Sequence, residues 1–159
     1  MKWAMSTSLS PIGIGNIGPA MRFSSSASIS ELREALFTNF SPDGMNDALA
    51  LNITAAFFTM TVFLQLLDAG TQNSLQRGFG KPAKEGTDVP SIQSQVIFTA
   101  SVSAFSRHWS SSPPYLTSKV AIMQVAKHAG TQLARFDNRV NAIAPGVYPS
   151  ELASAHREP

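Results

Sequence analysis

The segment that decides the fold is "YLTSKVAIMQVAKHAGTQLARF", Tyr115 to Phe136, together with the two apolar stretches that flank it. "QVIFTA", residues 95–100, and "RVNAIAPG", residues 139–146, read as short buried strands, the second of which ends in a Pro-Gly turn. Strand, helix and strand in this order predict a parallel crossover and therefore an α/β sheet. The residues whose helical spacing predicts the helix are Tyr115, Lys119, Ile122, Ala126 and Leu133.

The composition fits one globular domain with a core. The chain has 159 residues, of which 43% are hydrophobic, and it contains no cysteine. Disulfides, thiolate zinc sites and thiol nucleophiles are therefore excluded. The formal net charge is +2 and the basic residues are scattered, so we expect no nucleic-acid partner. We also expect no metal site, because His108, His128 and His156 lack the spacing of metal ligands.

The first predicted helix begins near Ser28. Ser28 and Glu31 have the spacing of a capping box, which marks the N-terminus of a helix. "SELREALF", residues 30–37, then reads as a short helix, and the turn residues "SPDG", 41–44, are expected to end it.

A longer helix is predicted from Met45 to about Ala69. Apolar residues recur there at intervals of three and four, and Gly70 is the expected C-cap. Residues 71–93 are polar and broken by Gly and Pro, which predicts a surface loop. The apolar residues of the stripe are Met45, Leu49, Ile53, Phe57, Met60, Leu64 and Leu67.

Part of this helix, "ALALNITAAFFTMTVFLQLL" at 48–67, has no charged residue and is long enough to span a bilayer. Polar residues interrupt the segment and no basic cluster marks a cytoplasmic end, so we expect no membrane span. A second apolar face instead predicts a helix covered on both sides, by its own sheet and by a partner chain. That face consists of Phe58, Val62, Phe63 and Leu66.

Gly13, Gly15 and Gly18 in "PIGIGNIGPA", residues 11–20, spell G-x-G-x-x-G, the spacing of a dinucleotide-binding turn. That turn requires a buried strand before it and a helix after it. The preceding "MKWAMSTSLS" has no continuous apolar run, and the sequence that follows is rich in serine. The motif by itself therefore favours a glycine-rich loop.

Tyr115 and Lys119 are four residues apart, so on a helix they share one face. Tyrosine is a poor base at neutral pH because its ordinary pKa is about 10, and a nearby ammonium favours the phenolate form. Ser101 follows the predicted strand 95–100, at the carboxyl edge where open α/β sheets bind ligands, and its hydroxyl can bond a substrate oxygen. A contact on the helix surface is the alternative interpretation of the Tyr-Lys pair.

Four motifs together resemble the short-chain dehydrogenase/reductase family, classical type. In chain order they are "LNITAAFF" at 51–58, "VIFTASVSA" at 96–104, "YLTSK" at 115–119 and "RVNAIAPGVYPSE" at 139–151. The resemblance runs over residues 12–152, and the Tyr-Pro-Ser after the Pro-Gly is similar to fungal members. It implies a partial Rossmann-like fold, with a doubly wound parallel sheet of which this chain holds the catalytic middle.

The resemblance also implies a role for each matching residue. Tyr115 would be the general acid/base, and Lys119 would lower the tyrosine pKa and bond the nicotinamide ribose. Ser101 would orient the substrate oxygen, with one inserted loop residue before Tyr115, and Asn52 would hold a water of the proton relay. The residues implied to bind the cofactor are Gly13, Tyr115, Lys119, Pro145, Gly146 and Ser150.

The family's phosphate-binding turn, T-G-x-x-x-G-x-G, has no counterpart in this sequence. "SPIGIGNIGPA" falls where the family has N-N-A-G, so the three glycines are not the pyrophosphate site. We therefore expect a chain that is truncated at the N-terminus and at the C-terminus. Its expected organisation is a non-native or disordered lead at 1–11, a partial domain at 12–152 and a tail at 153–159.

Two functions follow as expectations. The first is an NAD(P)-dependent oxidoreductase that interconverts a carbonyl and a hydroxyl of a small molecule and is inactive as this isolated fragment. Its cofactor is NADP or NAD, with NADP favoured, its location is cytoplasmic, and its full-length form is a homo-oligomer. The alternative is a non-catalytic fragment that pairs with an intact dehydrogenase through its interface helices.

Overall fold

The computed structural model describes residues 26–107 and 112–146. Helix α1 spans Ile29–Asn39, α2 spans Pro42–Leu49 and α3 spans Ala56–Leu75, with a π-helical segment, η1, at Ala50–Ala55. Strand β1, Gln95–Thr99, leads into the short 3₁₀ helix η2 at Val102–Phe105. Helix α4, Pro113–Leu133, is followed by the 3₁₀ turn η3 at Ala134–Phe136 and by strand β2 at Arg139–Ile143.

The two strands form a parallel sheet, and α4 makes the crossover between them. The register runs from Gln95 opposite Arg139 to Thr99 opposite Ile143. The predicted strand, helix and strand are therefore confirmed, as is the α/β class. A parallel pair puts the carboxyl ends of both strands at one edge, where the candidate site lies.

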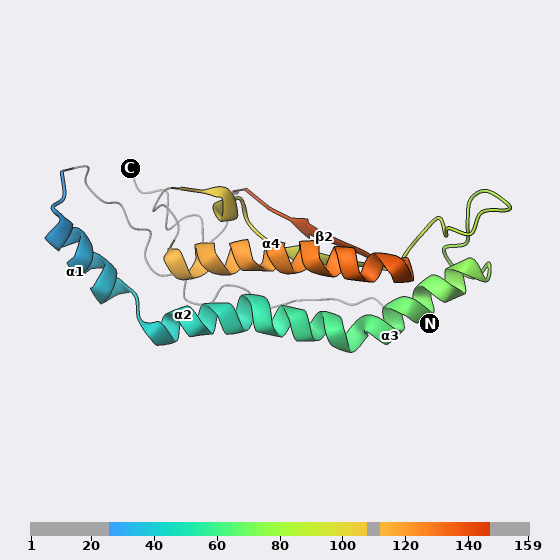
Figure 1. The fold of residues 1–159 in the computed structure, drawn as a ribbon, viewed down its shortest axis with the longest axis horizontal. Helices are drawn as coiled ribbons and strands as arrows, with labels where there is room; N and C mark the ends of the chain where they lie inside the picture. Colours follow the sequence, from blue (N-terminus) through green and yellow to red (C-terminus); the bar gives the residue numbers. More distant parts are fainter. Residues whose placement is uncertain (1–25, 108–111, 147–159) are drawn as a thin grey trace.

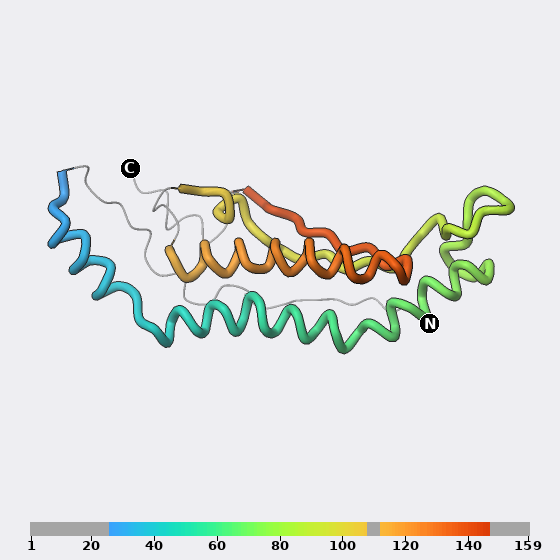
Figure 2. The backbone as a smooth tube through the Cα atoms, in the orientation of Figure 1, coloured from blue at the N-terminus to red at the C-terminus, as the bar shows by residue number. Residues whose placement is uncertain are grey.

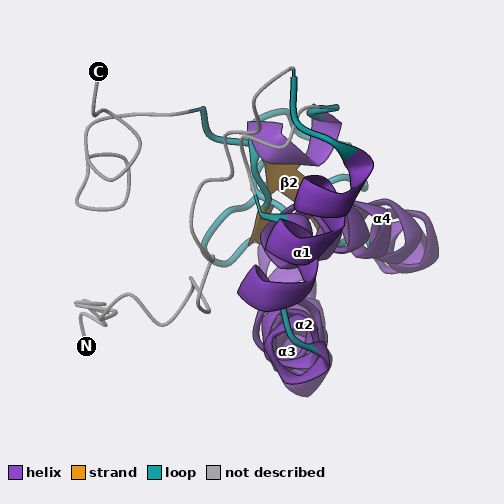
Figure 3. Ribbon diagram, turned by 90° about the vertical axis from the view of Figure 1, so that its left-hand side faces the viewer, coloured by secondary structure: helices purple, strands orange, loops and turns teal. Residues whose placement is uncertain are grey.

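The helices pack on one face of the sheet. Figure 1 shows α4 lying along the strands, with the long helix formed by α2, η1 and α3 running beside α4, and Figure 3 shows the same layers end-on. The tube in Figure 2 shows α1 bending away from this layer. The core is small and lies where α3, α4 and β1 meet. Its buried members are Met60, Phe98, Ala100, Ile122, Ala126 and Ala129.

The side chains of β1 alternate between two environments. Phe98 belongs to the core and Val96 packs against it, whereas Ile97 between them is 48% exposed. In the described part of the chain the long helices lie together on one face of the sheet, and no long helix lies over the other face. The fold is thus one face of an α/β unit, in keeping with a partial Rossmann-like sheet.

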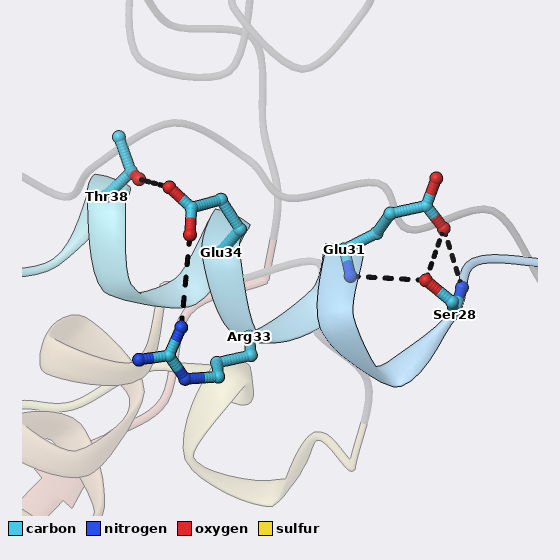
Figure 4. A network of polar contacts seen from close by, with 5 residues as sticks. All are labelled: Ser28, Glu31, Arg33, Glu34 and Thr38. Carbon is cyan, nitrogen blue, oxygen red and sulfur yellow. Dashed lines mark hydrogen bonds and ion pairs between the residues drawn. The ribbon is translucent and has the colours of Figure 1, made fainter.

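The capping box that begins α1 is confirmed, and Figure 4 shows it. The Glu31 main-chain N–H donates to Ser28 Oγ at 3.3 Å, while Glu31 Oε2 accepts from the Ser28 N–H at 2.7 Å and from its hydroxyl at 2.8 Å. These bonds to the carboxylate lower the pKa of Glu31 below its ordinary value. One turn on, Glu34 lies 4.0 Å from Arg33 and accepts a hydrogen bond from Thr38.

Helix α1 ends at Asn39, just before "SPDG", as predicted, but the same segment also begins the next helix. Ser41 caps the next helix, because its Oγ accepts a hydrogen bond from the Gly44 N–H at 3.1 Å. Pro42 occupies the first turn of α2, where its missing N–H has no cost. The helix predicted from Met45 therefore begins three residues earlier, at Pro42.

Gly70 is not a C-cap, which corrects the predicted end of this helix. Helix α3 continues to Leu75, and Gly70 lies inside it beside Ser94, where an added Cβ would come within 2.7 Å of Ser94 Oγ. The glycine therefore permits a close approach between α3 and the segment before β1. The predicted loop 71–93 accordingly starts only after residue 75. Ser74 anchors that loop by donating to the carbonyl oxygens of Gly80 and Ile92.

Most of the predicted stripe of the long helix faces the fold, although Phe57 is 41% exposed, and the second apolar face is exposed. Met60 is buried and Leu64 packs against the core, whereas Phe58, Val62 and Leu66 are 59%, 77% and 66% exposed. By length and composition alone, the continuous helix Pro42–Leu75 could cross a membrane, since its most apolar window has a mean hydropathy of 1.7 and is 11% buried.

Candidate active site

Tyr115 and Lys119 lie one turn apart in the first half of α4. The ammonium nitrogen of Lys119 lies 5.5 Å from the centroid of the Tyr115 ring. The two side chains thus share a face of the helix, as their spacing predicts. Pro113 and Pro114 open this helix and need no acceptor for a main-chain N–H there.

Lys119 reaches from α4 to the end of β1. Its side chain is 7% exposed, and Nζ donates a hydrogen bond to the carbonyl oxygen of Thr99 at 3.0 Å. Burial lowers the pKa of Lys119 below its ordinary value, because desolvation disfavours the ammonium. The bond to Thr99 uses one of three N–H donors, so two remain for a ligand.

Ser101 lies just beyond β1 at the same edge of the sheet. It is buried and extended, and its Oγ accepts a hydrogen bond from the Ser103 N–H at 3.1 Å, which caps η2. The Val102 N–H donates to the carbonyl oxygen of Pro145 at 3.0 Å. This bond brings the chain after β1 beside the Pro145-Gly146 turn after β2.

Asn52 joins the site through a residue that the sequence interpretation missed. Asn52 lies in η1, and its Nδ2 donates to Ser118 Oγ at 3.0 Å. Ser118 in turn donates to the main-chain carbonyl of Tyr115 at 2.8 Å. A π-helical turn is rare and occurs often at functional sites. The sequence offers one signal for Ser118: it is a small polar residue directly before Lys119, on the helix face that carries Ile122.

The described residues contain part of the predicted cofactor set. Pro145 and Gly146 are present at the sheet edge, and a Cβ added at Gly146 would meet no described atom within 4 Å. Gly13 and Ser150 lie outside the described residues, as do the predicted domain boundaries near residues 11 and 152. Within 26–107 and 112–146, no three His, Asp or Glu side chains are grouped to hold a metal ion.

Two surface hollows of the described chain lie away from these residues. One, of about 560 Å³, is an apolar groove between α1 and α2 that includes Leu32, Phe37 and Met45. The other, of about 620 Å³, lies between the end of α4 and the start of β2, near Arg139, which is the opposite edge of the sheet from Ser101. Neither hollow is lined by Tyr115 or Lys119, so the candidate site is defined by its polar side chains at the carboxyl edge of the sheet.

Comparison with known proteins shows which family this chain resembles. The family model described as short chain dehydrogenase matches residues 89–159. A short-chain dehydrogenase/reductase of Stachybotrys chartarum is 51% identical over 148 residues, which are 91% of this chain and 54% of that protein. One from Diaporthe leptostromiformis is 33% identical, over 89% of this chain and 43% of that protein. The chain thus spans about half the length of these curated relatives.

Solved structures with the same fold carry the comparison further. An NAD⁺-bound xylitol dehydrogenase matches with a TM-score of 0.57 and 21% identity, over 76% of this chain and 38% of that one. The NADP complex of Pseudomonas aeruginosa RhlG matches with a TM-score of 0.54 and 27% identity, over 72% of this chain and 40% of that one. These structures share the fold, and the family model together with the fungal relatives shows that the chain belongs to the short-chain dehydrogenase/reductase family.

Proposed function

We propose that this chain carries the proton-transfer part of an NAD(P)-dependent oxidoreductase that interconverts a carbonyl and a hydroxyl group of a small molecule. The observation that supports it is the buried ammonium of Lys119, which lies beside the Tyr115 ring and is tied to Thr99 at the carboxyl edge of the sheet. A buried lysine next to a tyrosine favours the phenolate and so prepares the phenol for acid/base work.

In the direction of reduction, the Tyr115 hydroxyl gives its proton to the substrate oxygen and becomes a phenolate. The Ser101 hydroxyl donates a hydrogen bond to the same oxygen, because its lone pair already accepts from the Ser103 N–H. The Lys119 ammonium then stabilises the phenolate until a proton returns. Asn52, on the π-helical turn, completes the proposed relay that supplies this proton.

A nicotinamide cofactor, when bound, supplies or takes the hydride. The two unused donors of Lys119 suit the ribose hydroxyls, and the open side of Gly146 suits a close ligand. We propose that Lys119, Tyr115, Pro145 and Gly146 hold its nicotinamide end, with Gly13 and Ser150 as further contacts. The cofactor is NADP or NAD, because the solved neighbours include proteins bound to each. Of the two, we favour NADP.

The test begins with the 5′ end of the transcript, read directly. The 159-residue chain and any longer in-frame chain are then assayed for cofactor binding and for carbonyl-dependent oxidation of NADPH and NADH. Tyr115→Phe should abolish turnover, whereas Thr131→Ala, which removes an exposed hydroxyl from the same helix, should retain it. Turnover by Tyr115→Phe equal to that of the unaltered protein would contradict the proposal.

The exposed face of α3 favours a second proposal, which is that this chain pairs with an intact dehydrogenase and does no chemistry itself. Phe58, Val62 and Leu66 present apolar surface that a partner helix can cover. We propose the same face for a homo-oligomer of the complete protein, in the cytoplasm and without a membrane or nucleic-acid partner. Co-expression with a tagged intact relative tests pairing, and a chain that stays separate counts against it.

A further inference from the structure

The hydroxyl of Ser118 links three parts of the candidate site. Ser118 is fully buried, accepts a hydrogen bond from Asn52 Nδ2 at 3.0 Å and donates one to the carbonyl oxygen of Tyr115 at 2.8 Å. Asn52 lies 66 residues earlier in the chain, on η1. One side chain therefore joins the π-helical turn to the turn of α4 that carries both Tyr115 and Lys119.

The contact to Tyr115 bears on the geometry of that turn. A serine that donates to the carbonyl three residues back competes with the helical hydrogen bonds and bends the helix slightly. Here that bond lies in the turn between Tyr115 and Lys119, whose ring centroid and Nζ are 5.5 Å apart. The second contact, from Asn52, fixes the rotamer of Ser118 and keeps that bond in place.

Packing alone does not require a hydroxyl at this position. Ser118 shares its helix face with Ile122, Ala126 and Ala129, which are all buried in the apolar core. Alanine would fit this environment and has a higher helix propensity than serine. A buried hydroxyl is tolerated only when it is hydrogen-bonded, and Ser118 uses its donor and an acceptor site.

We propose that Ser118 is a positioning residue, which holds the Tyr115 phenol and the Lys119 ammonium in register by coupling their turn to Asn52. The inference rests on the proposed function, because it assigns Ser118 a role in preparing that pair. Ser118 touches neither substrate nor cofactor in this role. It acts through the carbonyl of Tyr115 and the amide of Asn52.

The test follows the contact between Tyr115 and Lys119 by NMR in the 159-residue chain at neutral pH. The chain has two tyrosines, so Tyr148→Phe leaves Tyr115 as the one tyrosine, and a ring ¹³C label reports the NOE from its ring protons to the Lys119 side chain. Lys119 Nζ lies 5.5 Å from the centroid of this ring. Removing the link with Ser118→Ala should loosen the pair and weaken or abolish this NOE.

The controls separate positioning from a loss of stability. Ser74→Ala removes another buried serine that bonds only to loop carbonyls, and it should leave the NOE unchanged. Asn52→Ala should reproduce the loss seen in Ser118→Ala without altering the sequence of α4, and the double variant should lose no more. Ser118→Thr, which keeps the hydroxyl, should retain the NOE.

Two outcomes divide the inference from the function on which it rests. If the NOE persists in both Ser118→Ala and Asn52→Ala, the positioning role is overturned while the Tyr115 and Lys119 pair stands. If the NOE is absent from the Tyr148→Phe parent, Tyr115 and Lys119 do not form a pair and the proposed function fails at its own step.

Discussion

Lys119 Nζ donates a hydrogen bond to the carbonyl oxygen of Thr99 at 3.0 Å from a side chain that is 7% exposed. Thr99 is the last residue of β1, so the bond holds the start of α4 against the carboxyl edge of the sheet. Removing an ammonium from water is unfavourable, and one hydrogen bond to a neutral carbonyl offsets only part of that penalty. Burial of this ammonium therefore lowers the stability of the folded chain.

The first prediction concerns the pH dependence of stability. Burial lowers the pKa of Lys119 below 10.5, so at a pH below the lowered pKa the lysine is protonated in both states and the burial penalty is present in full. Above the lowered pKa the folded chain loses the proton while the unfolded chain keeps it, and stability rises with pH. The free energy of unfolding of the unaltered chain, relative to Lys119→Met, should therefore increase as the pH rises through the lowered pKa toward 10.5.

Urea unfolding at several pH values measures this difference directly. Lys127→Met removes an exposed lysine from the same helix and controls for the loss of one positive charge. Parallel pH profiles for the unaltered chain and Lys119→Met would show that burial does not perturb this lysine.

The sequence predicted β1, α4 and β2 because local pattern and tertiary packing agree there. Ile122 and Ala126 lie on one helix face and both are buried in the core, so the spacing of apolar residues alone was enough to predict this helix. Gly70 was misinterpreted for the opposite reason. Glycine serves equally as a cap or as a point of close approach, and the residue that decides, Ser94, is distant in sequence. The same holds for Ser118, whose partner Asn52 only the fold brings near.

Gly70 provides the second prediction. Inside a helix, alanine is more favourable than glycine by up to about 1 kcal/mol, but here its Cβ would meet Ser94 Oγ at 2.7 Å. Gly70→Ala combined with Ser94→Gly should therefore be more stable than Ser94→Gly alone, by thermal or urea unfolding. A Gly70 in the left-handed conformation of a C-cap would give the opposite sign, which would restore the sequence-based interpretation.

The third prediction concerns the capping box of α1. Ser28→Ala removes the acceptor for the Glu31 N–H and should lower the helix content in far-ultraviolet circular dichroism. Glu31→Gln keeps an acceptor oxygen for the Ser28 N–H but removes its negative charge, so it should lower the helix content less. Because hydrogen bonding lowers the pKa of Glu31, its stabilising effect is present above its ordinary value of 4.5 and is lost as the pH falls through the lowered value. Glu34→Gln, outside the box, is the matched control. An acid loss of helix that is the same in Glu31→Gln and the unaltered chain would rule out this origin.

Asp137 provides the fourth prediction, because it ends η3 with φ of 55°. This left-handed conformation is tolerated by Asp, Asn and Gly and is unfavourable for a β-branched side chain. Asp137→Val should therefore destabilise the chain by about 1–2 kcal/mol in urea unfolding, whereas Asp137→Gly should be tolerated. Equal stability of the two variants would mean that the turn before β2 relaxes out of this conformation.

The last prediction concerns the second apolar face of α3. Val62 and Leu66 are 77% and 66% exposed, and a soluble chain that leaves such a surface uncovered tends to associate through it. If the face pairs with a second copy or with an intact relative, Val62→Lys and Leu66→Lys should each weaken association by about tenfold or more in sedimentation equilibrium.

Gln72→Lys, which adds the same charge at an exposed polar position of α3, should leave association unchanged. The prediction separates two interpretations of the same helix, because a lysine inside a bilayer-spanning segment would instead reduce membrane retention. Carbonate extraction of the expressed chain decides between them. Release into the soluble fraction together with charge-sensitive association supports an interface helix, whereas retention in the membrane that Val62→Lys abolishes would assign this helix to the bilayer.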